Sequence, residues 1–305
     1  MTSRAVQEFL PIERVLGPAR SRYFGAGYRD VRYSISPAGS EKDALETATV
    51  SYPQRWSVDG EGRPRSPHLS SIDAIALSLM FLEARLTGSA NDLLRHTYVT
   101  AIDLRAESRP WLLLDGIPLS LTPLETPTGI RVQGRVGNIR VAIDLATAPG
   151  IAHEPGGRSV YGSLFQTTEC DSFVDGGTAG MKINGVHRMQ YSPDAAPPSG
   201  VESDWWPGAT MIDYFVALGQ ITQALVYQAA GVSRGAAGAL WMRTMQIRRP
   251  RPPLLRCGEF TSTAEIMRDR LLDRAGTRVH DVEVVAETST DVTAHSTVAY
   301  WEAGL

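Results

Sequence analysis

Two aspartates, a histidine and a glutamine stand near the starts of two apolar segments, where they could exchange protons with a bound substrate. These residues are His68, Asp73, Asp213 and Gln220. Asp73 follows Ser70 by three residues, and Asp213 stands in the same relation to Thr210. This spacing fits a helix capping box, in which the carboxylate satisfies free backbone N–H groups. A helix N-terminus also lowers a carboxyl pKa, which favours a base over an acid. Each aspartate is therefore a cap, a catalytic base or both.

His68 and Gln220 each have two interpretations. The ordinary pKa of imidazole suits a general base near neutral pH. The second apolar segment has Gly208 where the first has His68, and this asymmetry is typical of a duplicated enzyme with one surviving active site. A loop histidine bonded to the backbone would look the same. Gln220 follows Asp213 by seven residues on the same helical face, so its amide could orient a substrate carbonyl or satisfy a buried backbone group.

A basic, proline-rich run offers a site for a phosphate. Arg248, Arg249 and Arg251 lie among the prolines of residues 248–253, which favour extended backbone. Arginine forks bind phosphate well, so these residues could hold coenzyme A or the arm of a carrier protein. The alternative is a solvated strand end.

The remaining candidates are weaker. Cys170 could be a nucleophile, but it has no histidine beside it in the sequence, and buried cysteines are common. His153 and His187 have no metal-ligand spacing, so no metal is expected. P-loop, dinucleotide-binding and nucleophile-elbow motifs are all missing, which argues against nucleotide hydrolysis, dinucleotide redox chemistry and the α/β-hydrolases. The prediction is chemistry that needs no cofactor.

Composition limits the class of protein. The chain has 305 residues with 30 Lys and Arg against 33 Asp and Glu, and 43% of its residues are hydrophobic. A large core is possible, and a nucleic-acid partner is not expected. The sequence shows two cysteines without a CxxC pair, no signal peptide and no membrane-spanning apolar run. These features predict a cytoplasmic protein with no membrane partner.

An internal repeat predicts the architecture. Residues 68–80 align with 208–220 at an offset of 140, and Arg105 aligns with Arg248 at an offset of 143. Helices are predicted at 71–87 and 210–229, and both are apolar on nearly every face, so each must be wrapped. Strands are predicted at 31–36, 47–56, 98–105, 111–121, 129–136, 139–146, 159–168, 186–191, 240–248, 260–272, 279–288 and 292–301. We expect an α+β double hotdog with units at 1–150 and 151–305, each a helix embraced by a curved antiparallel sheet. Such a chain already contains the usual hotdog pair, and a homodimer of it remains possible.

The chain resembles the avirulence D (AvrD) family over most of its length. Three N-terminal motifs carry this resemblance. They are Leu16-Gly-Pro with Arg22-Tyr-Phe-Gly-Ala-Gly-Tyr28, then Val50-Ser-Tyr-Pro-Gln-Arg-Trp56, then His68-Leu-Ser-Ser-Ile-Asp73. The resemblance implies an enzyme that joins a β-ketoacyl group, supplied as a thioester of acyl-carrier protein or coenzyme A, to a small sugar such as xylulose, giving syringolide-like products. The γ-butyrolactone synthases, which use a phosphorylated triose acceptor, look like mechanistic relatives.

Residues 206–220 also resemble the second hotdog of polyketide-type dehydratases, in which an aspartate and a Gln or His face the acyl substrate. The His-x-x-x-Gly-x-x-x-x-Pro pattern of those enzymes is missing, because Ile72 stands four residues after His68. Three hypotheses remain. The first is acyl coupling, with His68 and Asp213 moving protons; the second is a hotdog dehydratase or thioesterase; the third is a protein that binds an acyl ligand without turnover.

Overall fold

The computed structural model describes residues 8–36, 46–86, 93–150, 156–175, 180–191, 197–234, 240–254, 258–274 and 277–301. His153 and the second cysteine of the sequence, Cys257, lie outside this part of the chain. Among the helices that are described, none is both long and apolar enough to cross a membrane.

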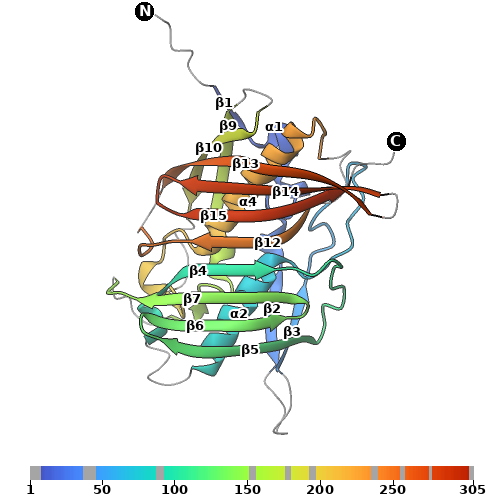
Figure 1. The fold of residues 1–305 in the computed structure, drawn as a ribbon. Helices are drawn as coiled ribbons and strands as arrows, with labels where there is room; N and C mark the ends of the chain where they lie inside the picture. The colour runs from blue at the N-terminus through green and yellow to red at the C-terminus, as the bar shows by residue number, and fades with distance from the viewer. Residues whose placement is uncertain are drawn as a thin grey trace, which may run out of the picture.

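A single antiparallel sheet runs through the whole molecule (Figure 1). Its strands are β1 (Phe9–Pro11), β2 (Arg32–Ser36), β3 (Glu46–Ser51), β4 (Thr97–Arg105), β5 (Ile117–Thr126), β6 (Gly129–Val136), β7 (Ile139–Thr147), β9 (Glu169–Asp175), β10 (Lys182–Gln190), β12 (Trp241–Arg248), β13 (Glu259–Arg274), β14 (Thr277–Thr288) and β15 (Thr293–Trp301). Their order in the sheet is β1-β9-β10-β13-β14-β15-β12-β4-β7-β6-β5-β3-β2. Two short strands, β8 (Arg158–Ser159) and β11 (Pro198–Ser199), pair separately.

The two halves of the sheet have the same topology. Reading outward from the centre, β4-β7-β6-β5-β3-β2 on one side corresponds to β12-β15-β14-β13-β10-β9 on the other. The central pair β4 and β12 is antiparallel, with Arg105 opposite Thr244 and Arg248 opposite Ala101. Arg105 and Arg248 therefore lie at equivalent places about a local two-fold axis, as their offset in the repeat requires. The division of the chain at residue 150 stays a prediction.

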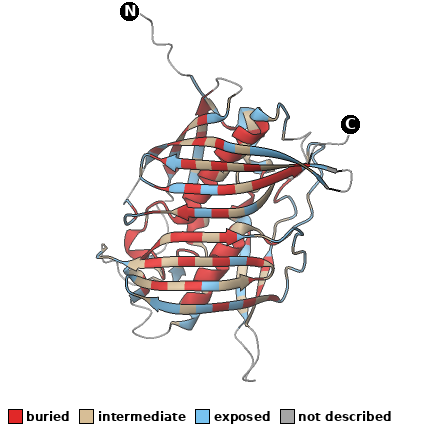
Figure 2. Cartoon of the chain, in the orientation of Figure 1, coloured by how far each residue is buried: buried red, intermediate tan, exposed pale blue. Residues whose placement is uncertain are grey.

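Two long helices cross the same face of this sheet (Figure 1). They are α2 (Ser71–Arg85) and α4 (Met211–Ala229), and they agree with the predicted helices to within two residues. α2 packs against β6 and β7, and α4 packs against β13 and β10. Both helices are buried over most of their surface, while the strands alternate buried and exposed residues (Figure 2). Each large aliphatic side chain buried here contributes roughly 1.5–3 kcal/mol. The predicted α+β class is confirmed, in a hotdog-type arrangement.

The N-terminal segment crosses from the first half to the second. Strand β1 pairs with β9, and α1 (Glu13–Leu16) packs against α4. Beyond α1, two short 3-10 helices, η1 (Ala19–Ser21) and η2 (Gly27–Asp30), lead to β2. Phe24 lies edge-on to Phe215 of α4, with 5.7 Å between ring centroids. Residues 9–31 thus cover the helix of the other half.

One predicted strand is wrong. Residues 159–168 form a tight turn and the 3-10 helix η3 (Leu164–Thr167), and β9 begins only at Glu169. The Ser159 hydroxyl accepts the Gly162 N–H at 2.8 Å, and the Phe165 N–H bonds to the Val160 carbonyl. These local bonds replace the ladder that an apolar run would otherwise form. A further 3-10 helix, η4 (Ser203–Trp205), directly precedes α4.

Candidate functional site

Asp73 is the centre of a buried hydroxyl cluster at the start of α2. Its Oδ1 accepts the Tyr33 hydroxyl at 3.0 Å and the Tyr23 hydroxyl at 3.1 Å. Its Oδ2 accepts the Ser70 N–H at 2.7 Å, which completes the predicted capping box, and also contacts the Tyr52 hydroxyl. Burial raises the pKa of Asp73 against the lowering effect of these bonds. The carboxyl group is fully buried, so it does not touch a ligand itself.

Tyr52 connects this cluster to the backbone of His68. Its hydroxyl lies 2.9 Å from the His68 carbonyl oxygen as well as against Asp73 Oδ2. Tyrosine has one hydroxyl proton, so both contacts are hydrogen bonds only when Asp73 is protonated. The raised pKa of Asp73 agrees with this arrangement. Tyr23 lies 2.5 Å from the Ser70 hydroxyl, so a chain of hydroxyl groups leads from Asp73 outward.

This series of hydroxyl groups leads to a pocket of about 190 Å³, here called the inner pocket. It is bounded by the first turn of α2, the C-terminal half of α4 and the start of β12. Its polar and aromatic lining comprises Arg22, Tyr23, Phe24, Trp56, Ser57, Arg65, His68, Ser70, Ser71, Trp111, Asn138, Gln223, Tyr227, Arg234 and Trp241. Of the four predicted catalytic residues, only His68 is in this set.

His68 is half-buried between two indole rings. Its ring centroid lies 5.5 Å from that of Trp56 and 5.9 Å from that of Trp241. Within the described part of the chain its one side-chain hydrogen bond joins Nδ1 to the Ser66 carbonyl at 3.3 Å. This contact assigns the proton to Nδ1 and leaves the lone pair on Nε2. His68 thus has the geometry of a base held in place by its neighbours.

Asp213 is not in the inner pocket. Its Oδ2 accepts the Thr210 N–H at 2.7 Å and the Thr210 hydroxyl at 2.8 Å, and the predicted capping box is present. Its Oδ1 is buried with no hydrogen-bond partner among the described residues. Burial raises its pKa to about 7. The hydrogen bonds described for Asp213 do not involve His68, and a joint catalytic role of the two residues stays a prediction.

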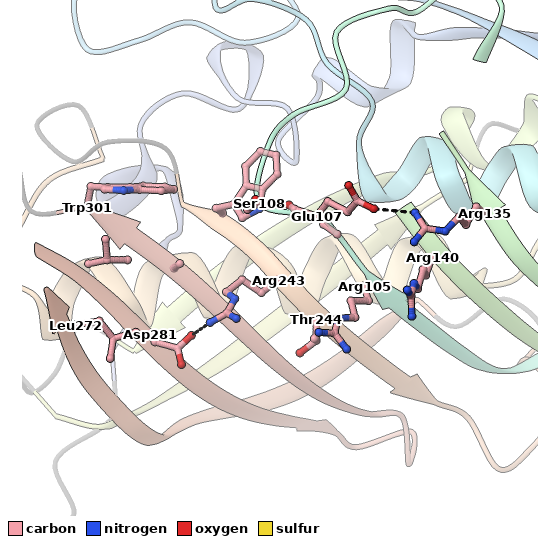
Figure 3. A pocket seen from close by; sticks show the side chains of 14 residues that line it. Arg105, Glu107, Ser108, Arg135, Arg140, Arg243, Thr244, Leu272, Asp281 and Trp301 are labelled. Atoms are coloured by element: carbon pink, nitrogen blue, oxygen red, sulfur yellow. Dashed lines mark hydrogen bonds and ion pairs between the residues drawn. The ribbon is translucent and has the colours of Figure 1, made fainter. Parts of the chain in front are cut away.

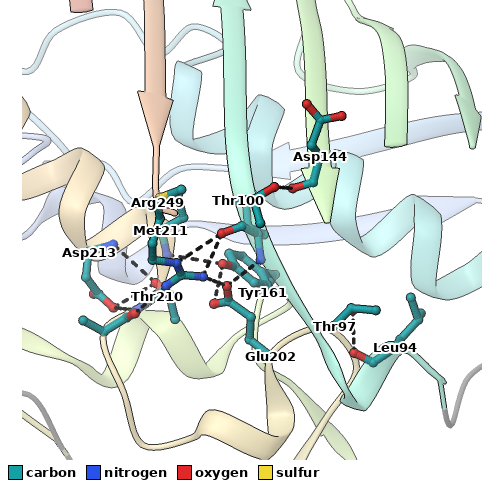
Figure 4. A network of polar contacts seen from close by, with 12 residues as sticks. Leu94, Thr97, Thr100, Asp144, Tyr161, Glu202, Thr210, Met211, Asp213 and Arg249 are labelled. Atoms are coloured by element: carbon teal, nitrogen blue, oxygen red, sulfur yellow. Dashed lines mark hydrogen bonds and ion pairs between the residues drawn. The ribbon is translucent and has the colours of Figure 1, made fainter. Parts of the chain in front are cut away.

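The site equivalent to the inner pocket, at the start of α4, is filled (Figure 4). Arg249 is 3% exposed and forms an ion pair with buried Glu202. Glu202 also accepts the Val99 N–H at 2.8 Å and the Tyr161 hydroxyl at 2.7 Å. In addition, the Tyr161 hydroxyl accepts the first N–H of α4, from Met211, at 3.3 Å. The Met211 N–H thus has a partner at this end, and the ion pair of Arg249 and Glu202 lies beside it.

Residue by residue, the two sites differ where a ligand would sit. The offset of 143 places Ala106 at the position of Arg249, and the backbone confirms it: the Ala106 N–H bonds to Arg243 and the Arg249 N–H bonds to Thr100. The offset of 140 places Ser71 at the position of Met211, but the Ser71 N–H has no partner in the described part of the chain. The side chain of Ala106 is a single methyl group, so it leaves empty the space that the guanidinium group of Arg249 fills in the other half.

A second, outer pocket of about 640 Å³ adjoins the inner one, and Ala106 and Trp241 line both. It lies at the ends of β4, β12, β14 and β15 (Figure 3). Arg135 bonds to Glu107 at 2.8 Å, and Arg243 bonds to Asp281 at 2.6 Å. Two further arginines of this pocket, Arg105 and Arg140, have no carboxylate partner among the described residues. The outer pocket therefore carries a net positive charge.

The predicted phosphate ligands have partners of their own. Arg248 bonds to Asp103 at 2.6 Å, and Arg251 bonds to Asp291 at 3.0 Å. Arg249 is buried in the ion pair described above, so its assignment to a coenzyme phosphate is corrected. A phosphate-binding role for Arg248 and Arg251 stays a prediction, and neither residue lines the inner or the outer pocket.

Gln220 is buried and supports an arginine. Its Oε1 accepts Arg22 Nη1 at 2.8 Å, and the two side chains are 198 residues apart in sequence. The amide of Gln220 thus satisfies a buried polar group, as one of its two interpretations expects. That group is the Arg22 side chain and not the backbone. Arg22 lines the inner pocket, so Gln220 acts on it indirectly.

The other candidates have structural environments. Burial raises the pKa of Cys170 to about 12, which disfavours a thiolate nucleophile. His187 lies between the hydroxyl groups of Ser172 at 2.8 Å and Ser262 at 2.7 Å, and burial lowers its pKa to about 3. In the described ranges, no group of three or more His, Cys, Asp or Glu side chains is placed to hold a metal ion.

The tyrosines and arginines of the site are not predicted by the sequence patterns considered above. Tyr23, Tyr52 and Arg22 lie in the N-terminal motifs that carry the family resemblance, which was the available signal. Arg65 and Arg234 lie in loops without a recognisable pattern. Arg65 lies shortly before α2 in the sequence, but only the fold brings Arg234 to this site, because its contacts with Ser21 and Ser57 span 213 and 177 residues.

The family model for the Pseudomonas avirulence D protein (AvrD) matches residues 8–301. The chain belongs to this family. No curated protein sequence matches this AvrD-family chain.

Solved structures give distant likenesses. A protein of unknown function with a hot dog fold from Alicyclobacillus acidocaldarius has 11% identity and a TM-score of 0.43, covering 92% of this chain and 98% of its own. A putative thioesterase from Novosphingobium aromaticivorans has 12% identity and a TM-score of 0.39, with coverage of 88% and 91%. An acyl-CoA thioesterase II from Mycobacterium marinum has 11% identity and a TM-score of 0.39, with coverage of 75% and 88%.

Proposed function

We propose that this chain is a tandem of two hotdog units and an enzyme that transfers a β-ketoacyl group from a thioester to a small sugar or triose. Membership of the AvrD family supports the proposal. The observation that carries it is the inner pocket, where a base, a chain of hydroxyl groups and a free helix N-terminus meet. The equivalent site is closed by Arg249 and Glu202, so one active site operates per chain.

The inner pocket supplies the groups that acyl transfer needs. A hydroxyl group of the acceptor gives its proton to Nε2 of His68 as its oxygen adds to the thioester carbonyl. The Ser71 N–H and the positive end of α2 stabilise the negative oxygen that forms. The C–S bond then breaks, and the thiolate takes the proton back from His68. The acceptor oxygen ends bonded to the acyl group, and the thiol is released.

Tyr23 and Ser70 connect the inner pocket to Asp73. Both line the inner pocket, and both bond to Asp73, which is buried with a raised pKa. A protonated Asp73 keeps the Tyr52, Tyr23 and Ser70 hydroxyl groups ordered without placing a negative charge beside the developing oxyanion. Asp73 thereby supports the site, whereas the sequence predicted that Asp213 moves protons together with His68.

The thioester is proposed to enter through the outer pocket. The inner pocket has room for a small acceptor and the reacting carbonyl, whereas the outer pocket has over three times its volume. Arg105 and Arg140 suit the phosphate groups of coenzyme A or of a carrier protein's pantetheine arm. Ala106 and Trp241, which line both pockets, would lie beside the thioester sulfur.

Mass spectrometry of the products tests this function. The protein is incubated with a β-ketoacyl thioester, with and without xylulose or dihydroxyacetone phosphate. We expect a product of acyl plus acceptor less the thiol, and a loss of at least about a hundredfold in rate for His68→Gln. Thiol release without acceptor would indicate a thioesterase, and loss of water alone a dehydratase. An unchanged thioester that co-purifies with the protein would instead indicate ligand binding.

A further inference from the structure

Three arginines converge on the inner pocket without an acidic partner. Arg22, Arg65 and Arg234 all line it, and none has a carboxylate within ion-pair distance among the described residues. Several other arginines of this chain pair with Asp or Glu, as Arg63 does with Asp59 at 3.0 Å. Three cations gathered in one small pocket repel one another, which costs free energy unless an anion joins them.

The protein holds the guanidinium group of Arg22 and the backbone of Arg65 in place. Arg22 is 2% exposed, and it donates from Nε to the Gly17 carbonyl at 3.0 Å and from Nη1 to Gln220. The backbone of Arg65 is fixed at both ends, because its N–H bonds to Ser57 and its carbonyl accepts the Trp56 indole N–H at 2.9 Å. A site arranged in advance binds a ligand with little loss of conformational entropy.

Several donors in this cluster are unused. Arg65 Nε is buried with no partner among the described residues. Arg234 reaches only distant acceptors, at 3.4 Å from the Ser57 hydroxyl and 3.5 Å from the Ser21 carbonyl. A buried donor without a partner costs about 1–3 kcal/mol, so the free protein retains these N–H groups at the expense of its stability. Burial, and then Arg234, lowers the pKa of Arg22 to about 10, against a smaller raising effect of Glu13.

The geometry points to a phosphate monoester as the group that Arg22, Arg65 and Arg234 bind in the inner pocket. Phosphate has two negative charges and three acceptor oxygens, which match three arginine forks better than one carboxylate does. The same wall carries the polar side chains of Gln223 and Tyr227, one turn apart on α4, which suit the hydroxyl groups of a sugar. This inference rests on the proposed function and specifies its acceptor: a phosphorylated triose or pentose rather than a free sugar.

The same phosphate chemistry could come from the thioester instead, since coenzyme A carries a phosphate monoester. The small volume of the inner pocket favours a compact acceptor, and the experiment separates the two sources. Isothermal titration calorimetry is done without thioester, using glycerol 3-phosphate, glycerol, coenzyme A and dephospho-coenzyme A as probes. The proteins are wild type, Arg65→Gln, Arg234→Gln and the control Arg63→Gln, whose arginine lies two residues away in an exposed ion pair.

We expect glycerol 3-phosphate to bind saturably and glycerol not to bind. Arg65→Gln and Arg234→Gln should each weaken the binding of glycerol 3-phosphate by about tenfold or more, and Arg63→Gln should leave it unchanged. Equal affinity in all four proteins, or no binding to wild type, would overturn the assignment. So would binding of coenzyme A that needs its 3′-phosphate and Arg65, with no binding of glycerol 3-phosphate, because the phosphate would then belong to the thioester.

Thermal melting gives a second readout that does not depend on activity. In phosphate-free buffer, Arg65→Gln and Arg234→Gln should melt at or above the wild-type temperature, because each removes one of three repelling charges. Added glycerol 3-phosphate should raise the wild-type Tm and raise that of the variants less. A variant that melts lower and responds to the ligand as wild type does would contradict the inference. If phosphate binds as expected but no acyl transfer occurs, the proposed function fails and the phosphate site stands.

Discussion

Ala106 and Arg249 occupy equivalent positions just beyond the two strands that join the halves of the sheet, and they decide which half has a pocket. The backbone N–H of each bonds to the opposite central strand, to Arg243 and Thr100 respectively. Arg249 fills its site and neutralises Glu202. Ala106 ends at its methyl group, and the space beyond it belongs to the inner and outer pockets. The difference between alanine and arginine at this pair therefore leaves a pocket in one half and a buried ion pair in the other.

Ala106→Arg should close the remaining site. The long side chain would reach the region between His68 and Trp241, as Arg249 reaches Glu202 in the other half. No carboxylate stands in the inner pocket to receive it, so the new charge also repels the arginines there. We expect acyl transfer to fall at least about a hundredfold, while the far-ultraviolet circular dichroism spectrum stays the same.

Ala106→Ser is the matched control, since it adds one atom without reaching the pocket centre. Its activity should remain within a few-fold of wild type. Full activity in Ala106→Arg would show that the inner pocket is not where the reaction occurs.

Breaking the ion pair of Arg249 and Glu202 should greatly lower the free energy of unfolding. Glu202→Gln leaves the Arg249 guanidinium buried without its counter-charge, and breaking such a pair costs about 3–5 kcal/mol. Replacing both residues, as Arg249→Met with Glu202→Gln, should recover part of this loss because no unpaired charge remains. Urea unfolding of the two single variants and the double variant measures the coupling. Additive losses would mean that the two side chains do not depend on each other.

The helices and most strands follow from local patterns, and the site does not. The capping boxes at Ser70 and Thr210 and the apolar runs behind them predict α2 and α4 closely, because those signals lie within a few residues. The environment of each aspartate depends on distant residues. Tyr23, Tyr33 and Tyr52 reach Asp73 across intervals of 50, 40 and 21 residues, and nothing near Asp213 in the sequence shows that its Oδ1 lacks a donor. Two nearly identical motifs thus have different chemistry.

Tyr23 and Tyr33 provide a matched test of what the hydroxyl cluster around Asp73 does. Both donate to Asp73 Oδ1, at 3.1 and 3.0 Å, but only Tyr23 lines the inner pocket. Tyr23→Phe and Tyr33→Phe should each lower the free energy of unfolding by about 1 kcal/mol, the usual value of one such hydrogen bond. Only Tyr23→Phe should also lower kcat, by about tenfold or more. Equal kcat values in the two variants would show that Asp73 and its tyrosines serve stability alone.

Asp213 should make the protein less stable as the pH rises from acid to neutral. Burial raises the pKa of its carboxyl group from 3.8 to about 7, so the folded state holds this proton more tightly than the unfolded state does. The stabilisation from the bound proton is complete below pH 3.8, decreases between pH 3.8 and about 7, and is absent above that. Over this window the change is on the order of a few kcal/mol.

Asp213→Asn removes the titration while its remaining oxygen can still accept the Thr210 N–H. Urea unfolding at intervals between pH 4.5 and 8 compares the two proteins. We expect the wild type to lose stability relative to Asp213→Asn as the pH approaches 7, with a constant difference at higher pH. The opposite slope, with wild type gaining on the variant as pH rises, would mean that Asp213 Oδ1 has a donor in solution and that the carboxylate is the stabilised form.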